Sequence, residues 1–460
     1  VANSDFDLQY NGGTVLALDL DRLREMVPEV WNADAKDPAE ICGKELPPNA
    51  QRLLYPGLCS PIDLSNAPDG KGSLITASVQ LGAFATDILT VARPRNKDPE
   101  ASGARLFVPV RGDPSVTWIE IDDDRDAAPA TRTLYCGQTR SSPRCDALHR
   151  AGEDPNTNLR KVVLPPEPYG IAADESGTAL VVTHQTTGSV SLLRNSWYDA
   201  PTPVVLEFVS GGFPAGGVGV AALPVPGFVF ATGIGYQPGF LVTFRAAPEV
   251  DLARYYDDAA AAPERPFITR AAAIGITVNA SGVDSRGIDI DASERRACEG
   301  NCSGERACLQ ACAAIPAQVY IANRTPPSLL VGETRSNVSP TGSDDLITIY
   351  DSVPLTFGAS RVVVGEITDK NGDPQTRVFA SCFDARYIFI YDPVGRRIDG
   401  HIRTGRGPHA MVVDPHQPFL YVAHFTDSYI GVVDLDQRHD QTYASIVASV
   451  GAPSKPRESK

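Results

Sequence analysis

The chain has 460 residues, of which 42 % are hydrophobic, so it is long enough to bury a sizeable core and too apolar for a disordered chain. Its net charge of −15, from 41 basic and 56 acidic residues, excludes the basic face that nucleic acid or an anionic membrane surface would need. No apolar run reaches the roughly 18 residues of a membrane-spanning helix. The 39 glycines and 38 prolines fit a chain that turns often.

Short runs of β-branched and aromatic residues, each closed by turn residues, recur along the chain. Seven of them match the third strand of a repeating unit: Thr14–Asp19, Val116–Asp122, Ser189–Leu193, Phe240–Phe244, Leu346–Asp351, Tyr387–Asp392 and Tyr429–Asp434. The last three begin about 42 residues apart, which is the length of one four-stranded blade. A second strand recurs at Leu106–Val108, Leu180–Val182, Val229–Ala231, Val319–Ile321, Val378–Ala380 and Leu420–Val422.

One such unit cannot bury both of its faces, but several units packed radially can. We therefore predict an all-β fold, a seven-bladed β-propeller that occupies residues 1–460 as a single domain. Both chain ends carry β runs, so the ring is expected to close with strands from both ends, and residues 443–450 are expected to form the last outer strand. The wider gaps between strands predict insertions at 21–72, 123–160, 246–280 and 293–316.

The insertion at 293–316 contains two CxxxC pairs, flanked by good helix formers. Positions i and i+4 share one face of a helix. Two short helices folded against each other would therefore pair Cys298 with Cys312 and Cys302 with Cys308, a small disulfide-linked helical hairpin. A four-cysteine zinc site is the alternative.

The other cysteines also favour disulfides. Cys42 with Cys59 and Cys136 with Cys145 could each close one loop, which leaves Cys382 unpaired among the nine cysteines. So many cysteines are unusual in a cytosolic protein of this size. We therefore predict an extracytoplasmic location, meaning the periplasm, the outer surface or the secreted fraction.

The clearest repeat lies at residues 405–436, GRGPHAMVVDPHQPFLYVAHFTDSYIGVVDLD, and the same pattern recurs at residues 166–193, PEPYGIAADESGTALVVTHQTTGSVSLL. These segments resemble the YVTN or lactonase-like β-propeller repeat. The resemblance implies a propeller fold. Because that superfamily includes lactonases, surface-layer proteins, metal enzymes and binding scaffolds, the resemblance leaves the function open.

In a propeller, the start of the first strand and the end of the second strand lie on one face near the central channel, and equivalent positions form rings. The first-strand ring is predicted to carry Thr86, Tyr169, Ala215, Arg286 and His409. Taking both rings, the candidate ligand-binding residues at this channel mouth are Tyr169, His184, Arg286, Asn323, His409 and His424. No residue is given a catalytic role, because the sequence has no Ser elbow, HExxH helix, P-loop or GxGxxG motif.

We expect a protein without a cofactor. Metal sites are the open alternatives. Cys382, His409 and His424 fall in the last two blades, and such a soft nitrogen–sulfur set suits copper or zinc. Channel lining or core packing explains the same residues. Residues 369–373, with the sequence DKNGD, resemble a short calcium loop, but they also suit an ordinary hairpin turn.

The leading functional hypothesis is an extracytoplasmic, non-enzymatic binding scaffold. Its insertions, three of them with cysteines, would contact another envelope or extracellular protein. A second hypothesis is a channel-mouth enzyme, either a lactonase-like hydrolase or a metal-dependent oxidoreductase, that uses His184, His409, His424, Cys382 and Arg286. A third is a structural subunit of a cell-envelope assembly, which an exposed apolar patch on one rim would favour.

Overall fold

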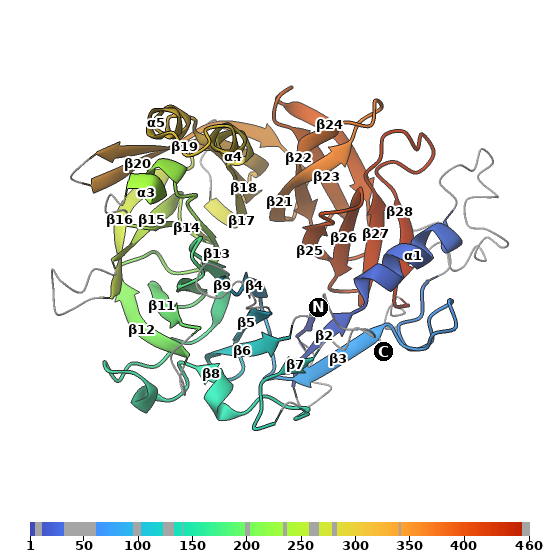
Figure 1. Ribbon diagram of the computed structural model, residues 1–460, viewed down its shortest axis with the longest axis horizontal. Helices are drawn as coiled ribbons and strands as arrows, with labels where there is room; N and C mark the ends of the chain where they lie inside the picture. The colour runs from blue at the N-terminus through green and yellow to red at the C-terminus, as the bar shows by residue number, and fades with distance from the viewer. Residues whose placement is uncertain are drawn as a thin grey trace.

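The computed structural model describes residues 1–4, 12–31, 61–94, 103–122, 133–139, 141–197, 203–232, 237–256, 266–277, 283–339 and 342–452. Within these residues the chain forms seven antiparallel sheets arranged as blades around a central axis (Figure 1). The protein is therefore a seven-bladed β-propeller, as the sequence predicts. Cys42 and Cys59 lie outside the described residues.

The first four blades follow one another along the chain. Blade 1 contains β1 (Ala2–Asn3), β2 (Thr14–Leu18) and β3 (Ile75–Gln80). Blade 2 contains β4 (Leu89–Ala92), β5 (Ala104–Val110), β6 (Ser115–Ile121) and β7 (Leu134–Tyr135), and β8 (Arg150–Ala151) also pairs with β6. Blade 3 contains β9 (Pro168–Ala173), β10 (Ala179–His184), β11 (Ser189–Asn195) and β12 (Val204–Gly211). Blade 4 contains β13 (Gly217–Ala222), β14 (Gly239–Phe244), β15 (Glu249–Tyr256) and β16 (Phe267–Gly275).

The last three blades complete the ring. Blade 5 contains β17 (Val283–Asp291), β18 (Ala317–Thr325), β19 (Pro327–Ser339) and β20 (Gly342–Pro354). Blade 6 contains β21 (Ala359–Thr368), β22 (Pro374–Cys382), β23 (Tyr387–Asp392) and β24 (Arg397–Arg403). Blade 7 contains β25 (Pro408–Val413), β26 (Phe419–His424), β27 (Tyr429–Asp434) and β28 (Ile446–Val450). The first strands of neighbouring blades contact one another, so they lie nearest the axis.

The core lies between blades. In β10, Leu180 and Val182 pack in a cluster with blade 2, whereas Val181 packs in a cluster with blade 4. Because successive side chains of a strand point to opposite faces, an uninterrupted apolar strand can fill two such interfaces at once. Each fully buried Val or Leu contributes about 1.5–3 kcal/mol, so these interfaces hold the ring together.

The ring closes differently from our expectation. Every blade consists of consecutive strands, and no described blade mixes strands from both chain ends. Helix α1 (Leu20–Val30) instead packs on the outside of blade 7, where Trp31 contacts Phe419 and Arg24 Nη2 lies 2.7 Å from Asp414 Oδ1. Ile62 also bridges Val450 of β28, which is the predicted last outer strand. Segments near the N-terminus thus pack against the outside of blade 7.

Some strand assignments from the sequence are wrong. Residues 229–231 belong to helix α3 (Gly227–Thr232), because a short apolar run fits a helix as well as a strand. Consequently Phe240–Phe244 is the second strand of blade 4. In blade 5, β19 is the third strand, so Leu346–Asp351 lies in the fourth strand. The predicted insertion at 246–280 supplies β15 and β16, so much of it belongs to a blade.

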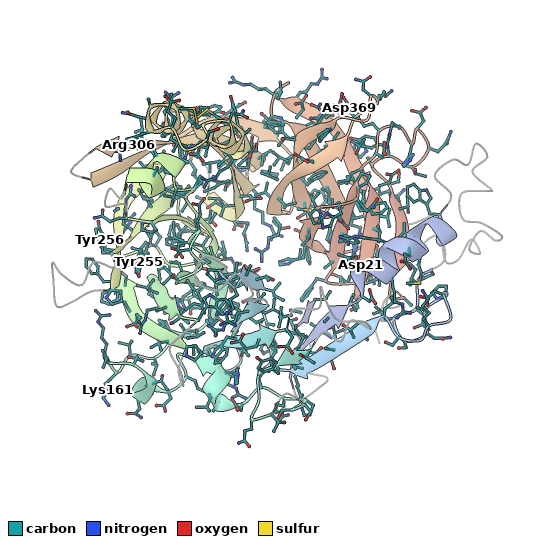
Figure 2. All side chains as sticks on the ribbon, in the orientation of Figure 1. Asp21, Lys161, Tyr255, Tyr256, Arg306 and Asp369 are labelled. Atoms are coloured by element: carbon teal, nitrogen blue, oxygen red, sulfur yellow. A yellow bond between two sulfur atoms is a disulfide. The ribbon has the colours of Figure 1, made fainter. Side chains whose placement is uncertain are left out.

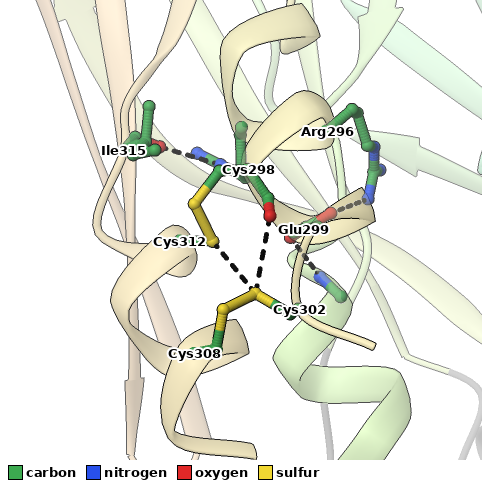
Figure 3. Close-up of a disulfide and its surroundings, with 9 residues drawn as sticks. Arg296, Cys298, Glu299, Cys302, Cys308, Cys312 and Ile315 are labelled. Carbon is green, nitrogen blue, oxygen red and sulfur yellow. Dashed lines mark hydrogen bonds and ion pairs between the residues drawn. A yellow bond between two sulfur atoms is a disulfide. The ribbon is translucent and has the colours of Figure 1, made fainter. Parts of the chain in front are cut away.

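The predicted helical hairpin is present as α4 (Ser293–Gly300) and α5 (Arg306–Ala313). Disulfides join Cys298 to Cys312 and Cys302 to Cys308, as shown in Figure 3, and these bonds remove the thiolates that a zinc site would need. Helix α3 packs against α5, and the Gly227 N–H donates to Glu299 Oε1 (2.6 Å). We call α3, α4 and α5 the helical cap.

The insertion at 123–160 is also constrained by a disulfide. The predicted disulfide between Cys136 and Cys145 is present, and the short 3₁₀ helices η1 (Ala147–His149) and η2 (Pro155–Thr157) follow it. None of the helices in the described part of the chain is both long enough and apolar enough to cross a membrane.

Candidate functional site on the entry face

The first strands of blades 2 to 7 begin on one face of the propeller, which we call the entry face. There the end of each second strand pairs with the start of the first strand or, in blade 2, with a residue just before it: Val110 with Ala85, His184 with Pro168, Phe244 with Gly217, Asn323 with Ser285, Cys382 with Ala359 and His424 with Pro408. The next residue along each first strand forms the predicted ring: Thr86, Tyr169, Val218, Arg286, Ser360 and His409. Ala215 was therefore placed in the wrong register, since the glycine-rich stretch 211–219 fits several registers.

The backbone enters all six first strands in the same way. The residue before each strand-entry pair has a positive φ, whether or not it is glycine: Phe84, Glu167, Gly216, Asp284, Gly358 and Gly407. Left-handed backbone is uncommon for residues with a side chain, so its recurrence here marks a constraint shared by the blades. The ring positions are thus structurally equivalent, although their side chains differ.

An ion pair crosses the axis one residue further along. At this position blades 3, 4, 5 and 7 carry glycine or alanine, whereas blade 2 carries Asp87 and blade 6 carries Arg361. Arg361 Nη2 lies 3.5 Å from Asp87 Oδ1, and each side chain is about one-fifth exposed. Because two or three blades separate blades 2 and 6 around the ring, these two side chains meet across the axis and occupy it at this level.

His409 lies beside this pair and against two aromatic rings. Its ring centroid is 6.3 Å from that of Phe383 and 6.4 Å from that of Phe425, and the two phenyl centroids are 6.3 Å apart. We call these three residues the aromatic cluster. Burial of the imidazole, and secondly the positive charge of Arg361, lower the pKa of His409 to about 3. His409 is therefore neutral near pH 7.

Part of this aromatic surface faces solvent. Phe425 is 44 % exposed and Phe357 is 62 % exposed. Phe357 precedes Gly358, whose carbonyl accepts a hydrogen bond from the Phe383 N–H (2.8 Å), so it belongs to the same side of blade 6. The entry face therefore presents exposed apolar rings at blades 6 and 7.

His184 and His424 lie inside their blades, so neither lines the entry face as predicted. His184 is wholly buried, with Nε2 2.8 Å from Ser191 Oγ. His424 stacks on Tyr429 at 4.1 Å. Burial lowers the pKa of both histidines to about 4. The Ser191–His184 contact has the spacing of a nucleophile and its base, but no substrate reaches two fully buried side chains.

The predicted copper or zinc ligands are not brought together. Cys382 packs with Ala322 and Ala359, its Sγ donates to the Thr356 carbonyl (3.4 Å), and burial raises the pKa of the thiol to about 12. Among the described residues, the sulfur, nitrogen and carboxylate groups that cluster as metal ligands would are those of Cys302, Cys308 and Cys312. All three are in disulfides.

The remaining predicted residues are held by local partners. Asn323 is buried, and its Nδ2 donates to the Pro326 carbonyl (2.8 Å). Arg286 Nη2 donates to Asp284 Oδ2 (3.0 Å). The Tyr169 carbonyl accepts from Thr86 Oγ1 (2.8 Å), which links blades 2 and 3. Of these, Arg286 and Tyr169 stay partly accessible on the entry face.

The DKNGD segment forms the hairpin turn between β21 and β22, at the opposite end of blade 6 (Figure 2). Asp369 Oδ1 accepts hydrogen bonds from the N–H groups of Asn371 (2.8 Å) and Asp373 (2.9 Å). These backbone donors, that of Asp373 first, hold the pKa of Asp369 below its usual value. The carboxylate thus stabilises its own turn.

Three residues of the entry face were not predicted from the sequence: Arg361, Phe383 and Phe425. A usable signal existed, because each phenylalanine directly follows the second-strand residue of the strand-entry pair. In blades 2, 4 and 5 that next residue is an arginine: Arg111, Arg245 and Arg324. Phenylalanine at 383 and 425 is therefore a departure from the other blades that the repeat alignment could have revealed.

No protein-family model matches the sequence, and no curated protein does. Similar solved structures include a functionally unknown protein from Desulfotomaculum acetoxidans, with 12 % identity, 83 % of this chain and 88 % of that chain covered, and a TM-score of 0.47. A periplasmic gluconolactonase from Pseudomonas aeruginosa has 15 % identity, coverages of 84 % and 91 %, and a TM-score of 0.49. A hydrazine synthase from Kuenenia stuttgartiensis has 11 % identity, coverages of 86 % and 98 %, and a TM-score of 0.41. Identities this low assign no activity, and the YVTN resemblance stays a prediction.

Proposed function

We propose that this protein is an extracytoplasmic binding scaffold that holds a partner protein on its entry face. The observation that carries the proposal is the aromatic cluster of Phe383, His409 and Phe425, with Phe357 exposed on the same side. Aromatic residues are enriched at the centres of protein interfaces and supply much of the binding energy. The disulfides of the described residues support an oxidising compartment.

The charges around the cluster favour an apolar contact. Three arginines of the entry face each lie against a carboxylate: Arg361 with Asp87, Arg286 with Asp284, and Arg324 with Asp384. His409 adds no charge near pH 7 because of its lowered pKa. A partner would therefore insert apolar or aromatic side chains here, and strongly charged ligands would gain little.

The protonation state of His409 supports binding over catalysis. A general base works best when its pKa lies near the operating pH. With a pKa of about 3, His409 is a weak base. It serves better as a flat, neutral ring between two phenyl groups.

The test is photo-crosslinking from position 425 in an extract of the native envelope or medium, followed by affinity measurement with the captured protein. Phe425→Ala should weaken binding about tenfold or more, as expected for a central aromatic residue. Val394→Ala is the matched control, because Val394 is 88 % exposed in the β23–β24 turn on the opposite face. Equal affinity of the two variants would refute the proposal.

A further inference from the structure

The two disulfides of the helical cap lie in direct contact with each other. Cys302 Sγ lies 3.5 Å from Cys312 Sγ, although Cys302 is bonded to Cys308 and Cys312 is bonded to Cys298. Figure 3 shows Cys312 Sγ between the sulfurs of Cys298 and Cys302. A disulfide bond is about 2 Å long, so an approach of about 1.5 Å would bond Cys302 to Cys312. The cap therefore holds its two disulfides at a distance from which they can exchange partners.

Each of these disulfides joins a buried cysteine to a partly exposed one. Cys302 and Cys312, which we call the inner cysteines, are 3 % and 1 % exposed. Cys298 and Cys308, which we call the outer cysteines, are partly exposed. A thiol from solution therefore reaches a disulfide at its outer cysteine and releases the inner cysteine as a thiolate. Because the inner sulfurs contact each other, this thiolate is released next to the second disulfide, where intramolecular attack is fast.

The chain around Cys308 favours attack at this outer cysteine. Residues 303–307, which connect α4 to α5, are all exposed and lead directly to Cys308. Cys308 lies in the first turn of α5, where the backbone N–H groups and the helix dipole favour an anion such as the attacking thiolate. Cys298 lies in the last turn of α4, where the helix dipole disfavours an anion. We therefore expect an incoming thiolate to attack Cys308.

We propose that the helical cap oxidises dithiols of a partner protein by disulfide exchange, and that its remaining disulfide then joins the inner cysteines. A substrate thiolate attacks Cys308 Sγ, which forms a mixed disulfide and releases Cys302 as a thiolate. Cys302 Sγ then attacks Cys312 Sγ, which forms the Cys302–Cys312 bond and releases Cys298 as a thiolate. The second substrate thiol attacks the substrate sulfur of the mixed disulfide, which closes the substrate disulfide and releases Cys308.

This sequence balances in atoms and electrons. The dithiol loses two electrons and two protons, and the two outer cysteines of the cap gain them as thiols. One substrate disulfide forms, and the cap keeps one of its two disulfides in the new pairing. The cap shares no residue with the aromatic cluster, so this activity is independent of the proposed partner surface.

The test treats the unreduced protein with a limiting amount of dithiothreitol, quenches it with acid and alkylates the denatured chain with N-ethylmaleimide. Trypsin cleaves after Arg306, which separates the cysteines of α4 from those of α5. Fragmentation of the two peptides in a mass spectrometer then locates each alkyl group. The Cys136–Cys145 disulfide is the internal control, because both of its cysteines are buried and it should stay intact.

The pattern of labels decides between relayed and separate reduction. In caps that have lost one disulfide, we expect alkyl groups on Cys298 and Cys308 and a bond between Cys302 and Cys312. Labels on Cys302 with Cys308, or on Cys298 with Cys312, would mean that each disulfide is reduced separately. Either of these results, or a cap that dithiothreitol leaves intact, would overturn the proposal.

A pair of double variants tests the contact of the inner sulfurs directly. Cys298→Ser with Cys308→Ser leaves the inner cysteines alone in the cap, and they should bond to each other in air. The matched control, Cys302→Ser with Cys312→Ser, leaves the outer cysteines, which lie at the two ends of the row of four sulfurs (Figure 3) and should stay thiols. Free inner thiols, or outer cysteines that bond as readily, would refute the relay. The labelling experiment uses the unmodified protein, so it decides the matter even where a variant does not fold.

Discussion

Gly219 is the position at which the packing of the first strands can be tested most directly. A Cβ added to Gly219 would lie 2.2 Å from the Arg286 carbonyl oxygen and 2.6 Å from Thr243 Oγ1. That hydroxyl accepts the Gly219 N–H (2.9 Å) and donates to the same Arg286 carbonyl, so it joins the first strands of blades 4 and 5. Gly219→Ala should therefore separate these strands and weaken both hydrogen bonds.

The expected cost follows from three contributions. Overpacking in a dense interior costs about 1–3 kcal/mol, and weakening the Thr243 hydrogen bonds adds about 1 kcal/mol. Alanine also restricts the unfolded chain, which returns about 0.4–1 kcal/mol. The free energy of unfolding should thus fall by about 1–3.5 kcal/mol. Gly275→Ala is the matched control, because no atom lies within 4 Å of its added Cβ.

The assay is guanidinium unfolding followed by tryptophan fluorescence, with the disulfides intact. The midpoint of Gly219→Ala should shift to lower denaturant, whereas that of Gly275→Ala should stay the same or rise slightly. If the two variants unfold at the same midpoint, the first strands are not packed as closely as described. The alignment of the ring positions would then lose its physical basis.

Three further changes test other parts of the fold. Arg254→Met removes the partner of Asp345, whose carboxylate lies 2.7 Å away with a fully buried side chain, and should cost about 3–5 kcal/mol in the same unfolding assay, whereas a loss below 1 kcal/mol would contradict the buried ion pair. Replacing Cys302 and Cys308 together by serine removes a disulfide worth about 2 kcal/mol, and hydrogen exchange should increase in the helical cap but not in blade 7. His424→Phe removes a histidine whose pKa is lowered from 6.5 to about 4. The neutral histidine contributes fully to the stability of the native protein above pH 6.5, and this contribution is lost as the pH falls from 6.5 toward 4. Over that range the variant should lose about 3 kcal/mol less stability than the unmodified protein.

The fold could be predicted because its signals are local. Alternation, turn residues and spacing identify β6, β11, β23 and β27 as third strands without any knowledge of packing. The assignment fails in blade 4, where the predicted second strand is helix α3, and in blade 5, where β19 is the third strand and Leu346–Asp351 lies in the fourth. The disulfide pairing of the hairpin could also be predicted from a local signal, since positions four apart share a helix face.

The site was less predictable because its contacts are not local. Asp87 and Arg361 are far apart in sequence, and their meeting depends on the position of every blade between them. Equivalent positions also differ in their surroundings. In blade 3, Val182 pairs across the strands with Ser191, which contacts His184. In blade 7, the equivalent residue, which pairs with Val422, is Gly431. A histidine in the repeat therefore does not imply a shared role.

Departures from the repeat are consequently better guides to function than the repeat itself. Charged side chains replace small residues at Asp87 and Arg361, and phenylalanine replaces arginine or glutamine at Phe383 and Phe425. These departures all lie on the entry face, at blades 2, 6 and 7. The helical cap covers blades 4 and 5 from the opposite side, because it lies in connections between first and second strands. Recognition should therefore be sensitive to substitutions on one half of one face, and substitutions in the cap should act on stability.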